Sequence, residues 1–308
     1  MAMKTSATAD QHAPLPSPAR VAVIVATKGR PQASAHVLRL LEKQSVQPAI
    51  TLFSACTDAD IEPGLETPLA VEYIFGPAGL PAQRNRALVT VLSRADFVVF
   101  FDDDFVPSPY WIERCLQAFL AEPDVAGISG ALLHDGAVGA ALSWDDACSL
   151  VLQADAVAGT PRPLATLSGL YGCNMAYRVS AIGNLRFDER LVLYGWLEDK
   201  DFSRAIGRKG RLVESDAMLG VHLGLRSGRV SGKRFGFSQI VNAWYLHKKG
   251  VLSTKEVWSF IAKALTANGI RSIRPESHID RRGRFAGNLV GVTDLLIGRC
   301  RPERASDL

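Results

Sequence analysis

The sequence has no long apolar run, and none of its apolar stretches approaches the roughly 18 residues that a membrane-spanning helix needs. Its start, MAMKTSATADQHAPLPSPAR, contains no hydrophobic segment of the signal-peptide kind. Cysteine is scarce: the five cysteines are scattered and never form a CxxC pair, which argues against a disulfide framework and against a zinc site. We therefore expect a cytoplasmic protein with reduced cysteines.

Internal repeats and coiled-coil heptads are also missing, and 47% hydrophobic with 21% charged residues is typical of a globular protein. The net charge of +4 conceals an uneven distribution. From residue 224 to the end there are 16 Lys and Arg against 6 Asp and Glu, whereas the preceding residues have 19 against 25. Such a basic part favours contact with phosphates or an anionic membrane surface, and a solvated basic face is the plain alternative.

The order of the apolar segments predicts an α/β fold. Residues 21–26 read VAVIVA, a continuous β-branched run that is typical of a strand buried on both faces. Helical spacing follows as far as Pro48, a second strand is predicted at 49–53, and the alternation continues to a strand at 97–101. This order favours a parallel sheet with right-handed crossovers.

We divide the chain into three parts. Residues 1–19 are small, polar and proline-rich and are predicted as a flexible leader. Residues 20–223 form the predicted α/β domain, and residues 224–308 form a basic, mainly helical region. Between residues 134 and 170 the sequence is rich in Ala and Gly with weak periodicity, and no element is predicted there.

Three adjacent aspartates, Asp102, Asp103 and Asp104, follow the strand at 97–101. Open α/β sheets bind ligands at the carboxyl ends of their strands. Neighbouring carboxylates about 4 Å apart repel each other by roughly 4 kcal/mol at an effective dielectric near 20, so a cation is expected among them. Mg²⁺ and Mn²⁺ prefer such oxygens and share them with substrate phosphates, whereas the alternative is a solvent-exposed acidic turn.

Three further stretches carry groups suited to chemistry. Glu198 and Asp199 stand at the start of a helix that is predicted to end at Gly210, and the helix dipole stabilises carboxylates at such a start. His222 ends an apolar run, and a neutral imidazole is a group that can complete a metal site. Arg84 and Arg86 begin a predicted helix behind a glycine-rich loop, a place suited to a phosphate or a base. Each stretch also has a purely structural explanation. The Glu-Asp pair would simply be a good helix start, His222 a structural histidine, and Arg84 and Arg86 surface arginines.

Taken in order, these features resemble a family 2 glycosyltransferase of the GT-A fold. The resemblance runs from residue 21 to residue 223 and rests on six motifs: VAVIVATKGRP, PAQRNRAL, FFDDDFVPSPYW, GCNMAYR, LYGWLEDKDFSRAIGRKG and VHL. It implies a Rossmann-like, mostly parallel central sheet with helices on both faces. It also implies a metal-dependent, inverting transferase of the hexosyltransferase type, which moves a sugar from a nucleoside-diphosphate sugar to an acceptor hydroxyl.

The resemblance implies roles for single residues as well. Binding of the nucleotide sugar falls to Thr27, Arg30, Arg84, Asp102 and Asp103. Binding of Mn²⁺ or Mg²⁺ falls to Asp104 and His222. Asp199 matches the general base, with Glu198 beside it, and Asn174 and Trp196 would face the acceptor. A single attack from the opposite face inverts the anomeric carbon, so no covalent nucleophile is needed.

One motif departs from the family pattern. After its second strand the family commonly has a DDGS-like turn that reads the base, whereas this chain has FSACTDAD with Asp58 and Asp60 displaced. The nucleoside of the donor is therefore left undecided among uridine, thymidine and guanosine. SGKRFGFSQ and GNLVGVTDLLIGRCRP resemble the tails of bacterial polysaccharide-assembly transferases. They imply a glycan or lipid-linked acceptor and a peripheral contact with the inner face of the cell membrane.

Three other functions were weighed. Residues 102–106 fit the Asp-x-Asp-x-Val element of phosphatase-type hydrolases, but that element usually opens its domain, and here two or three strand–helix units come first. A non-catalytic nucleotide-sugar-binding module would keep the fold and the metal. The basic C-terminal part raises a nucleic-acid role, yet its aromatic residues have helix-like spacing and are predicted to be core or interface, so we expect no nucleic-acid partner.

Overall fold

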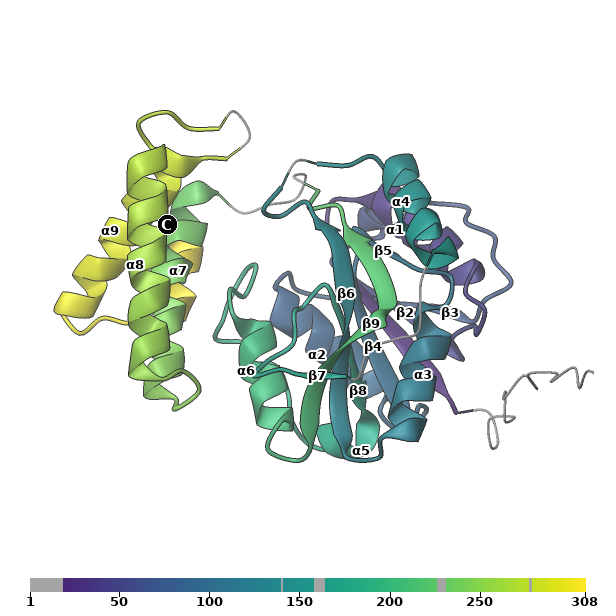
Figure 1. Ribbon diagram of the computed structural model, residues 1–308. Coiled ribbons are helices and arrows are strands. Elements are labelled where there is room, and N and C mark those ends of the chain that lie inside the picture. The colour runs from purple at the N-terminus through teal and green to yellow at the C-terminus, as the bar shows by residue number, and fades with distance from the viewer. Residues whose placement is uncertain (1–18, 140, 158–163, 226–230, 277–278) are drawn as a thin grey trace, which may run out of the picture.

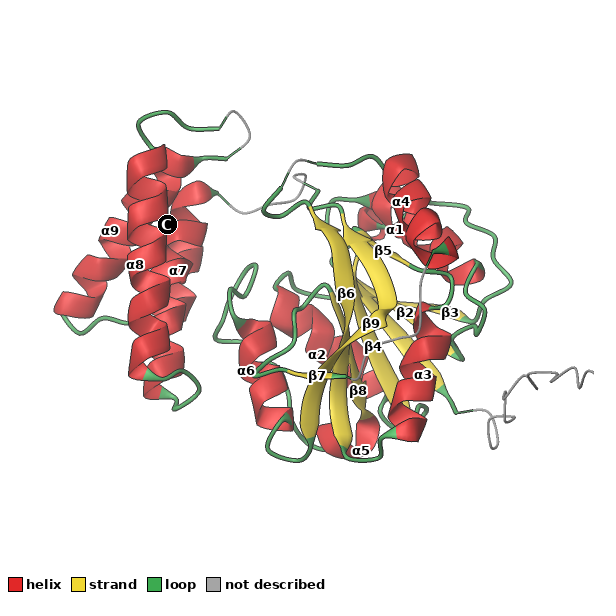
Figure 2. Ribbon diagram, viewed as in Figure 1, coloured by secondary structure: helices red, strands yellow, loops and turns green. Residues whose placement is uncertain are grey.

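The computed structural model describes residues 19–139, 141–157, 164–225, 231–276 and 279–308 (Figures 1 and 2). The predicted leader lies outside these residues, apart from its last position. The strands are β1 (Val21–Ala26), β2 (Ile50–Ala55), β3 (Val71–Phe75), β4 (Phe97–Asp102), β5 (Phe105–Pro107), β6 (Val125–Asp135), β7 (Ala165–Thr166), β8 (Asn174–Arg178) and β9 (Arg211–His222).

The helices of the α/β part are α1 (Pro31–Glu42), α2 (Leu80–Val91), α3 (Trp111–Ala121), α4 (Trp144–Ala156), α5 (Val179–Ile182) and α6 (Glu198–Ile206). The C-terminal part consists of α7 (Gly232–Lys248), α8 (Thr254–Arg271) and α9 (Arg281–Leu296). Two 3₁₀ turns, η1 (Asp58–Asp60) and η2 (Pro302–Asp307), complete the set. Among the described helices, none is both long and apolar enough to cross a membrane.

The strands form one sheet in the order β3-β2-β1-β4-β8-β6-β9-β5, with β7 paired to β9. Six strands run in one direction (β1, β2, β3, β4, β6 and β9) and three run against them (β5, β7 and β8). The predicted α/β fold with a mostly parallel sheet is therefore confirmed. A strand followed by a helix start was expected at NMAYRVSAIG and is confirmed as β8 and α5, but β8 inserts between β4 and β6 and is antiparallel to both, a direction that was not expected.

Successive side chains of the central strands belong to two different apolar cores, one on each face of the sheet, so these strands are buried on both faces. In β1, Val21, Val23 and Val25 belong to one apolar core, whereas Ala22 and Ile24 belong to a second core on the opposite face. Helices cover each face, as Figure 2 shows. Successive side chains of a strand point to opposite faces, so a continuous apolar run is the sequence that such a sheet requires.

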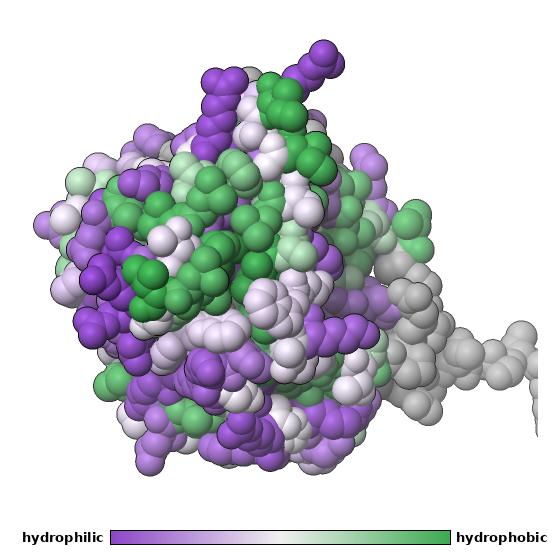
Figure 3. Space-filling model, turned by 90° about the vertical axis from the view of Figure 1, so that its left-hand side faces the viewer, coloured by the Kyte–Doolittle hydropathy of each residue, from purple (hydrophilic) through white to green (hydrophobic). Residues whose placement is uncertain are grey.

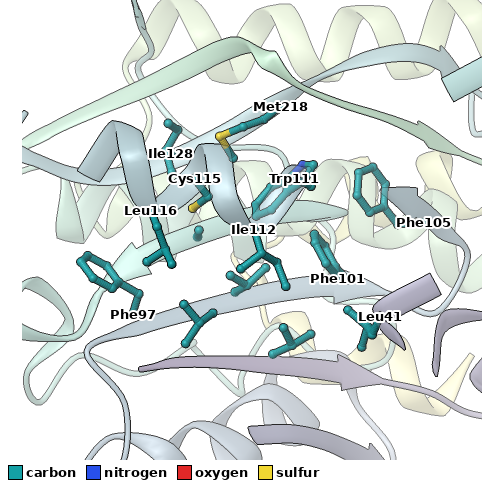
Figure 4. Close-up of a cluster of buried hydrophobic side chains, with 14 of the residues drawn as sticks. Leu41, Phe97, Phe101, Phe105, Trp111, Ile112, Cys115, Leu116, Ile128 and Met218 are labelled. Atoms are coloured by element: carbon teal, nitrogen blue, oxygen red, sulfur yellow. The ribbon is translucent and has the colours of Figure 1, made fainter. Parts of the chain in front are cut away.

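The larger core lies between the sheet and α3 (Figure 4). Trp111, at the start of α3, is fully buried, and its ring meets that of Phe101 edge to face at 4.8 Å between centroids. Phe101 in turn lies 5.0 Å from Phe105 of β5. These rings flank the two-residue connection between β4 and β5. Their packing in the core therefore fixes the backbone of the aspartate segment.

The C-terminal helices pack on one another in a bundle beside the α/β part (Figure 1). Close approach of α7 and α9 depends on glycine, because a Cβ at Gly236 would collide with the Arg284 carbonyl and one at Gly287 with the Lys233 carbonyl. Two of these helices were expected from the sequence, and α9 was not. Its start is marked by Asp280, whose carboxylate accepts a hydrogen bond from Gly283 N at 2.7 Å.

Two local expectations need correction. The helix predicted to run from the Glu-Asp pair to Gly210 ends at Ile206, because Gly207 follows as its C-cap. The stretch in which no element was predicted contains α4, whose N-cap Ser143 accepts a hydrogen bond from Asp146 N at 3.1 Å. A serine followed three residues later by an acidic residue is a helix-start signal that the sequence did offer.

Candidate active site

The aspartate segment and His222 meet at the carboxyl ends of the central strands. Asp102 is the last residue of β4 and pairs with Ala26 of β1. The turn formed by Asp103 and Asp104 leads into β5, which runs antiparallel to β9 so that Phe105 lies opposite His222. Sheet register thus joins residues that are far apart in the sequence.

Asp102, Asp104 and His222 form a group whose ligand atoms all lie within 4.8 Å of one another. His222 Nε2 is 3.3 Å from Asp104 Oδ1 and 4.0 Å from Asp102 Oδ2. Asp104 and His222 are buried, and Asp102 is partly exposed. Two carboxylates and one imidazole suit Mn²⁺ or Mg²⁺, and the partly open side leaves room for oxygens of a substrate, so this donor set fits the expected cation.

His222 is oriented by a second carboxylate. Its Nδ1 lies 2.8 Å from Asp135 Oδ1, which directs Nε2 toward Asp102 and Asp104. Burial opposes protonation of the ring, but the hydrogen bonds to Asp104 and Asp135 outweigh it and raise the pKa of His222 to about 10. Tyr171 donates from its hydroxyl to Asp135 Oδ2 at 3.2 Å. Neither Asp135 nor Tyr171 was identified from the sequence, and Asp135 lies in the stretch where no element was predicted.

Asp103 faces away from this group toward the loop after β1. Its Oδ2 accepts a hydrogen bond from Thr27 Oγ1 at 2.7 Å, and its Oδ1 pairs with Arg30 Nη1 at 2.6 Å. Burial raises the pKa of Asp103 to about 7, against the attraction of Arg30. Arg30 also lies 3.6 Å from Asp104. Thr27, Arg30 and the aspartates therefore surround one region at the strand ends, and their role in nucleotide-sugar binding stays a prediction.

Arg84 is buried, with 2% of its surface exposed, and connects the two acidic motifs. Its guanidinium pairs with Glu198, lies 2.8 Å from Asp102 Oδ1 and donates to the Gly172 carbonyl at 2.9 Å. The ring of Phe187 lies 5.5 Å from the guanidinium carbon. Burial is the largest influence on Glu198 and raises the pKa of this carboxyl to about 8. This burial could not be predicted from the sequence, because an arginine at a helix start is usually exposed.

Asp199 lies beside the GCNMAYR motif. Its Oδ2 accepts a hydrogen bond from Gly172 N at 3.0 Å, and its Oδ1 accepts one from Lys200 N at 2.7 Å. Burial raises the pKa of Asp199, and the two backbone donors oppose that shift. A Cβ at Gly172 would stand 3.3 Å from Asp199 Cβ and 3.4 Å from the guanidinium of Arg84, so glycine keeps the two acidic motifs close.

The loop before α6 has a strained backbone. Leu193 and Leu197 adopt φ values of 62° and 72°, which side chains other than glycine rarely adopt. Trp196, half-buried between them, packs its ring 5.4 Å from that of Phe235 in α7, and its carbonyl accepts a hydrogen bond from Asn242 at 3.0 Å. The C-terminal bundle thus holds the loop that positions the Glu-Asp pair.

Ion pairs extend this connection along α6. Lys249 of the bundle lies 2.7 Å from both Asp188 and Asp201, and Arg204 of α6 lies 2.5 Å from Glu256 of α8. The bundle is therefore bonded to the helix that carries the expected base.

Asn174 lies in β8 and is 1% exposed. Its Nδ2 donates to the Gly130 carbonyl at 3.1 Å, which ties β8 to β6. The contact with an acceptor that the resemblance implies for this residue stays a prediction.

Asp60 is the acidic residue after β2 that the structure brings to the strand ends. Its Oδ1 accepts a hydrogen bond from Gly29 N at 2.6 Å, and its Oδ2 accepts one from Cys56 N at 2.9 Å. The carboxylate therefore shapes the loop that also carries Thr27 and Arg30.

Comparison with known proteins gives one family match and several similar folds. Residues 57–185 match the family model described as Glycosyl transferase family 2. No curated protein matches the sequence. The fold is similar to that of TarS from S. aureus, with 18% identity, a TM-score of 0.51, and 84% of this chain but 46% of the TarS chain covered. The structure of TarS residues 1–349 gives 16% identity and a TM-score of 0.51, over 94% of this chain and 83% of that one.

A third similar structure is that of glucosyl-3-phosphoglycerate synthase from Mycobacterium tuberculosis, in complex with Mn²⁺, UDP and glucosyl-3-phosphoglycerate. Identity is 14% and the TM-score is 0.50, with 77% of this chain and 82% of that chain covered. At such identities the likeness shows the fold. Together, the family match over residues 57–185 and the GT-A-like fold support a glycosyltransferase of family 2.

Proposed function

We propose that the protein transfers a sugar from a nucleoside-diphosphate sugar to an acceptor hydroxyl, with inversion at the anomeric carbon and dependence on Mn²⁺ or Mg²⁺. The observation that carries the proposal is the group of Asp102, Asp104 and His222 at the strand ends, bridged through Arg84 to the Glu-Asp pair of α6.

Asp102, Asp104 and His222 would hold the cation, which when bound neutralises charge on the departing diphosphate. Thr27 and Arg30 already bond to Asp103, and we propose that they line the nucleotide side of the site. The binding of UDP and Mn²⁺ by the mycobacterial synthase supports a nucleotide sugar as the donor. Asp60 fixes the loop that these residues share. The identity of the nucleotide base in the donor stays open among uridine, thymidine and guanosine.

Asp199 is the proposed general base. Its two backbone hydrogen bonds fix the carboxylate, and it needs only to accept the proton that the acceptor hydroxyl loses as its oxygen attacks. Glu198 lies behind it and is bound to Arg84, so we propose a positioning role for Glu198 rather than proton transfer. Trp196 remains the proposed acceptor contact, and Asn174 is better placed to support β8.

The acceptor is proposed to be a glycan or a lipid-linked glycan in polysaccharide or glycoconjugate assembly, with the basic C-terminal region in peripheral contact with the membrane. Water can replace an unknown acceptor in a first test. The protein is incubated with UDP-, dTDP- or GDP-sugars and Mn²⁺, and the slow hydrolysis of the donor is followed by proton NMR.

The proposal predicts release of the sugar with inverted configuration, dependent on the cation. Release with retained configuration would contradict inversion. Donor binding without turnover, unchanged in Asp199→Asn, would indicate a binding module. Turnover of an aryl phosphate in place of nucleotide sugars would indicate the phosphatase-type alternative.

A further inference from the structure

An apolar strip runs along α8 and α9: Leu265 and Val292 pack against the bundle core, whereas Trp258, Leu289 and Leu296 are exposed. Residues three or four positions apart share a helix face, and on α8 this face carries Trp258, Ala262, Leu265 and Gly269. On α9 it carries Phe285, Leu289, Val292 and Leu296. A Cβ at Gly269 would lie 3.2 Å from the Phe285 ring, so the two faces adjoin. We call these eight residues the outer strip.

Three large side chains of the outer strip and two of the connection beyond it are unusually exposed for apolar residues. Trp258 is 54% exposed, Leu289 49% and Leu296 82%. Ile270 and Ile273, where α8 ends, are 70% and 76% exposed. Figure 3, in which the bundle faces the viewer, shows a continuous hydrophobic area across it, bordered by hydrophilic residues. Apolar areas of this kind, rimmed by polar groups, mark surfaces that bind a partner or a membrane.

The exposed charges of the same helices are nearly all positive. Between residues 254 and 301 the exposed basic side chains are Lys255, Lys263, Arg271, Arg274, Arg282, Arg299 and Arg301. The acidic residues of this part are engaged elsewhere: Glu256 with Arg204, Glu276 with Arg281, and Asp294 with Arg304. Within the described positions of this range, Asp280 is the one exposed carboxylate, and it caps α9.

These positive charges favour an anionic lipid surface over a second copy of this chain as the partner of the outer strip. A second copy of this chain placed on the strip by a two-fold axis would bring the same basic side chains against each other. An anionic lipid surface would instead attract each of them, while the headgroup boundary receives the apolar side chains. Tryptophan is also the side chain that prefers this boundary.

The connection at the end of the outer strip also lies toward the same side of the molecule as the proposed site. In Figure 1 the α8–α9 connection and the carboxyl end of β6 both lie toward the upper side of the molecule. Asp135 at the end of β6 bonds His222, so that side carries the proposed cation group. A bilayer that receives Ile270 and Ile273 would lie toward the side of the protein that carries the proposed cation group.

We propose that the outer strip and the Ile270–Ile273 segment dock the protein on a bilayer containing anionic lipids. The docking does not depend on the transfer reaction; only its consequence, delivery of a lipid-linked acceptor, rests on the proposed function. The full-length chain is mixed with vesicles of phosphatidylcholine alone or with about 30% phosphatidylglycerol, and bound protein is measured by flotation.

We expect binding to the anionic vesicles and little to the neutral ones, weakened by high salt. Ile270→Ser with Ile273→Ser should weaken it at least about tenfold. Lys263→Gln or Arg274→Gln should each weaken it about fivefold. The matched control is Val89→Ser with Val157→Ser, which removes two valines that are 60% and 83% exposed on the α/β part and should leave binding unchanged.

Absence of binding to anionic vesicles, or equal binding by the isoleucine variant and the control, would overturn the proposal. So would a concentration-dependent dimer in sedimentation that the isoleucine variant abolishes while vesicle binding persists. Circular dichroism confirms that each variant is folded. Hydrolysis of the donor, measured without vesicles, tests the proposed function separately and should be the same in all these variants.

Discussion

Asp102 and Glu198 are joined by the guanidinium of Arg84, which lies 2.8 Å from Asp102 and is paired with Glu198. The carboxylate at the end of β4 and the first residue of α6 thereby belong to one buried charge network. Because Asp199 follows Glu198, this network sets the distance between the proposed cation group and the proposed base.

Removing Arg84 should therefore damage both stability and activity. Arg84→Met leaves two carboxylates without their cation, and we expect a loss of about 3–5 kcal/mol in the free energy of unfolding, measured with urea. Adding Glu198→Gln removes one of the two buried carboxyl groups that have lost their partner and should recover part of that loss. Additive effects of the two substitutions would contradict the coupling.

Asp199→Asn tests the base. The amide keeps the shape of the side chain but cannot accept the proton, so kcat should fall by about 10²–10⁴-fold while the affinity for the donor is retained. Asp201→Asn is the matched control, because Asp201 lies on the same helix but bonds Lys249 of the bundle. A similar fall in kcat for both variants would show that helix position, not proton transfer, had been disturbed.

Asp135→Asn tests the orientation of His222. The carboxylate bonds His222 Nδ1 and is not itself in the cation group, so its replacement should weaken Mn²⁺ affinity by about 10–100-fold without removing a ligand. Isothermal titration with Mn²⁺ in the presence of the donor nucleotide measures this. Unchanged affinity would show that the ring is held by other contacts.

The contact of Glu256 with Arg204 should make the docking of the bundle sensitive to acid. The hydrogen bond from Arg204 holds the pKa of Glu256 at about 2, below its ordinary value of 4.5. Its stabilisation is therefore complete above about pH 4.5 and is lost as the pH falls toward 2. Glu256→Gln should be less stable than the wild type at pH 7, and the difference should shrink in this window.

Urea unfolding at pH 7, 4 and 2.5 provides the comparison, with the exposed Glu66→Gln as control. A difference between Glu256→Gln and the wild type that stays constant across these pH values would contradict the role of this ion pair.

The sequence was sufficient for the central strands, because burial on both faces demands the continuous apolar runs of β1 and β4. It was also sufficient to place the aspartates at a strand end. It could not reveal Asp135, because this residue meets His222 only through the register of β6 and β9, which contains irregularities that no local pattern encodes. The antiparallel direction of β8 could not be predicted for a similar reason, since a strand's direction depends on where the chain returns to the sheet.

Arg84 shows a different limit. Its position at the start of α2 is typical of an exposed residue, and its burial becomes explicable only when the carboxylates from β4 and α6 are seen around it. The role of the C-terminal helices was likewise hidden, because the bonds from Asn242 and Lys249 to the α6 region join distant segments.

The cation group is the centre of the account, and melting temperature in the presence of nucleotides tests it most directly. The protein is heated with UDP-, dTDP- and GDP-sugars, with and without Mn²⁺, beside Asp104→Asn and His222→Ala. We predict that one class of nucleotide, at about 100 times its dissociation constant, stabilises the wild type by about 2.7 kcal/mol with Mn²⁺, and much less without it or in either variant. No rise with any nucleotide, or an equal rise without Mn²⁺ and in both variants, would contradict a cation held by Asp102, Asp104 and His222.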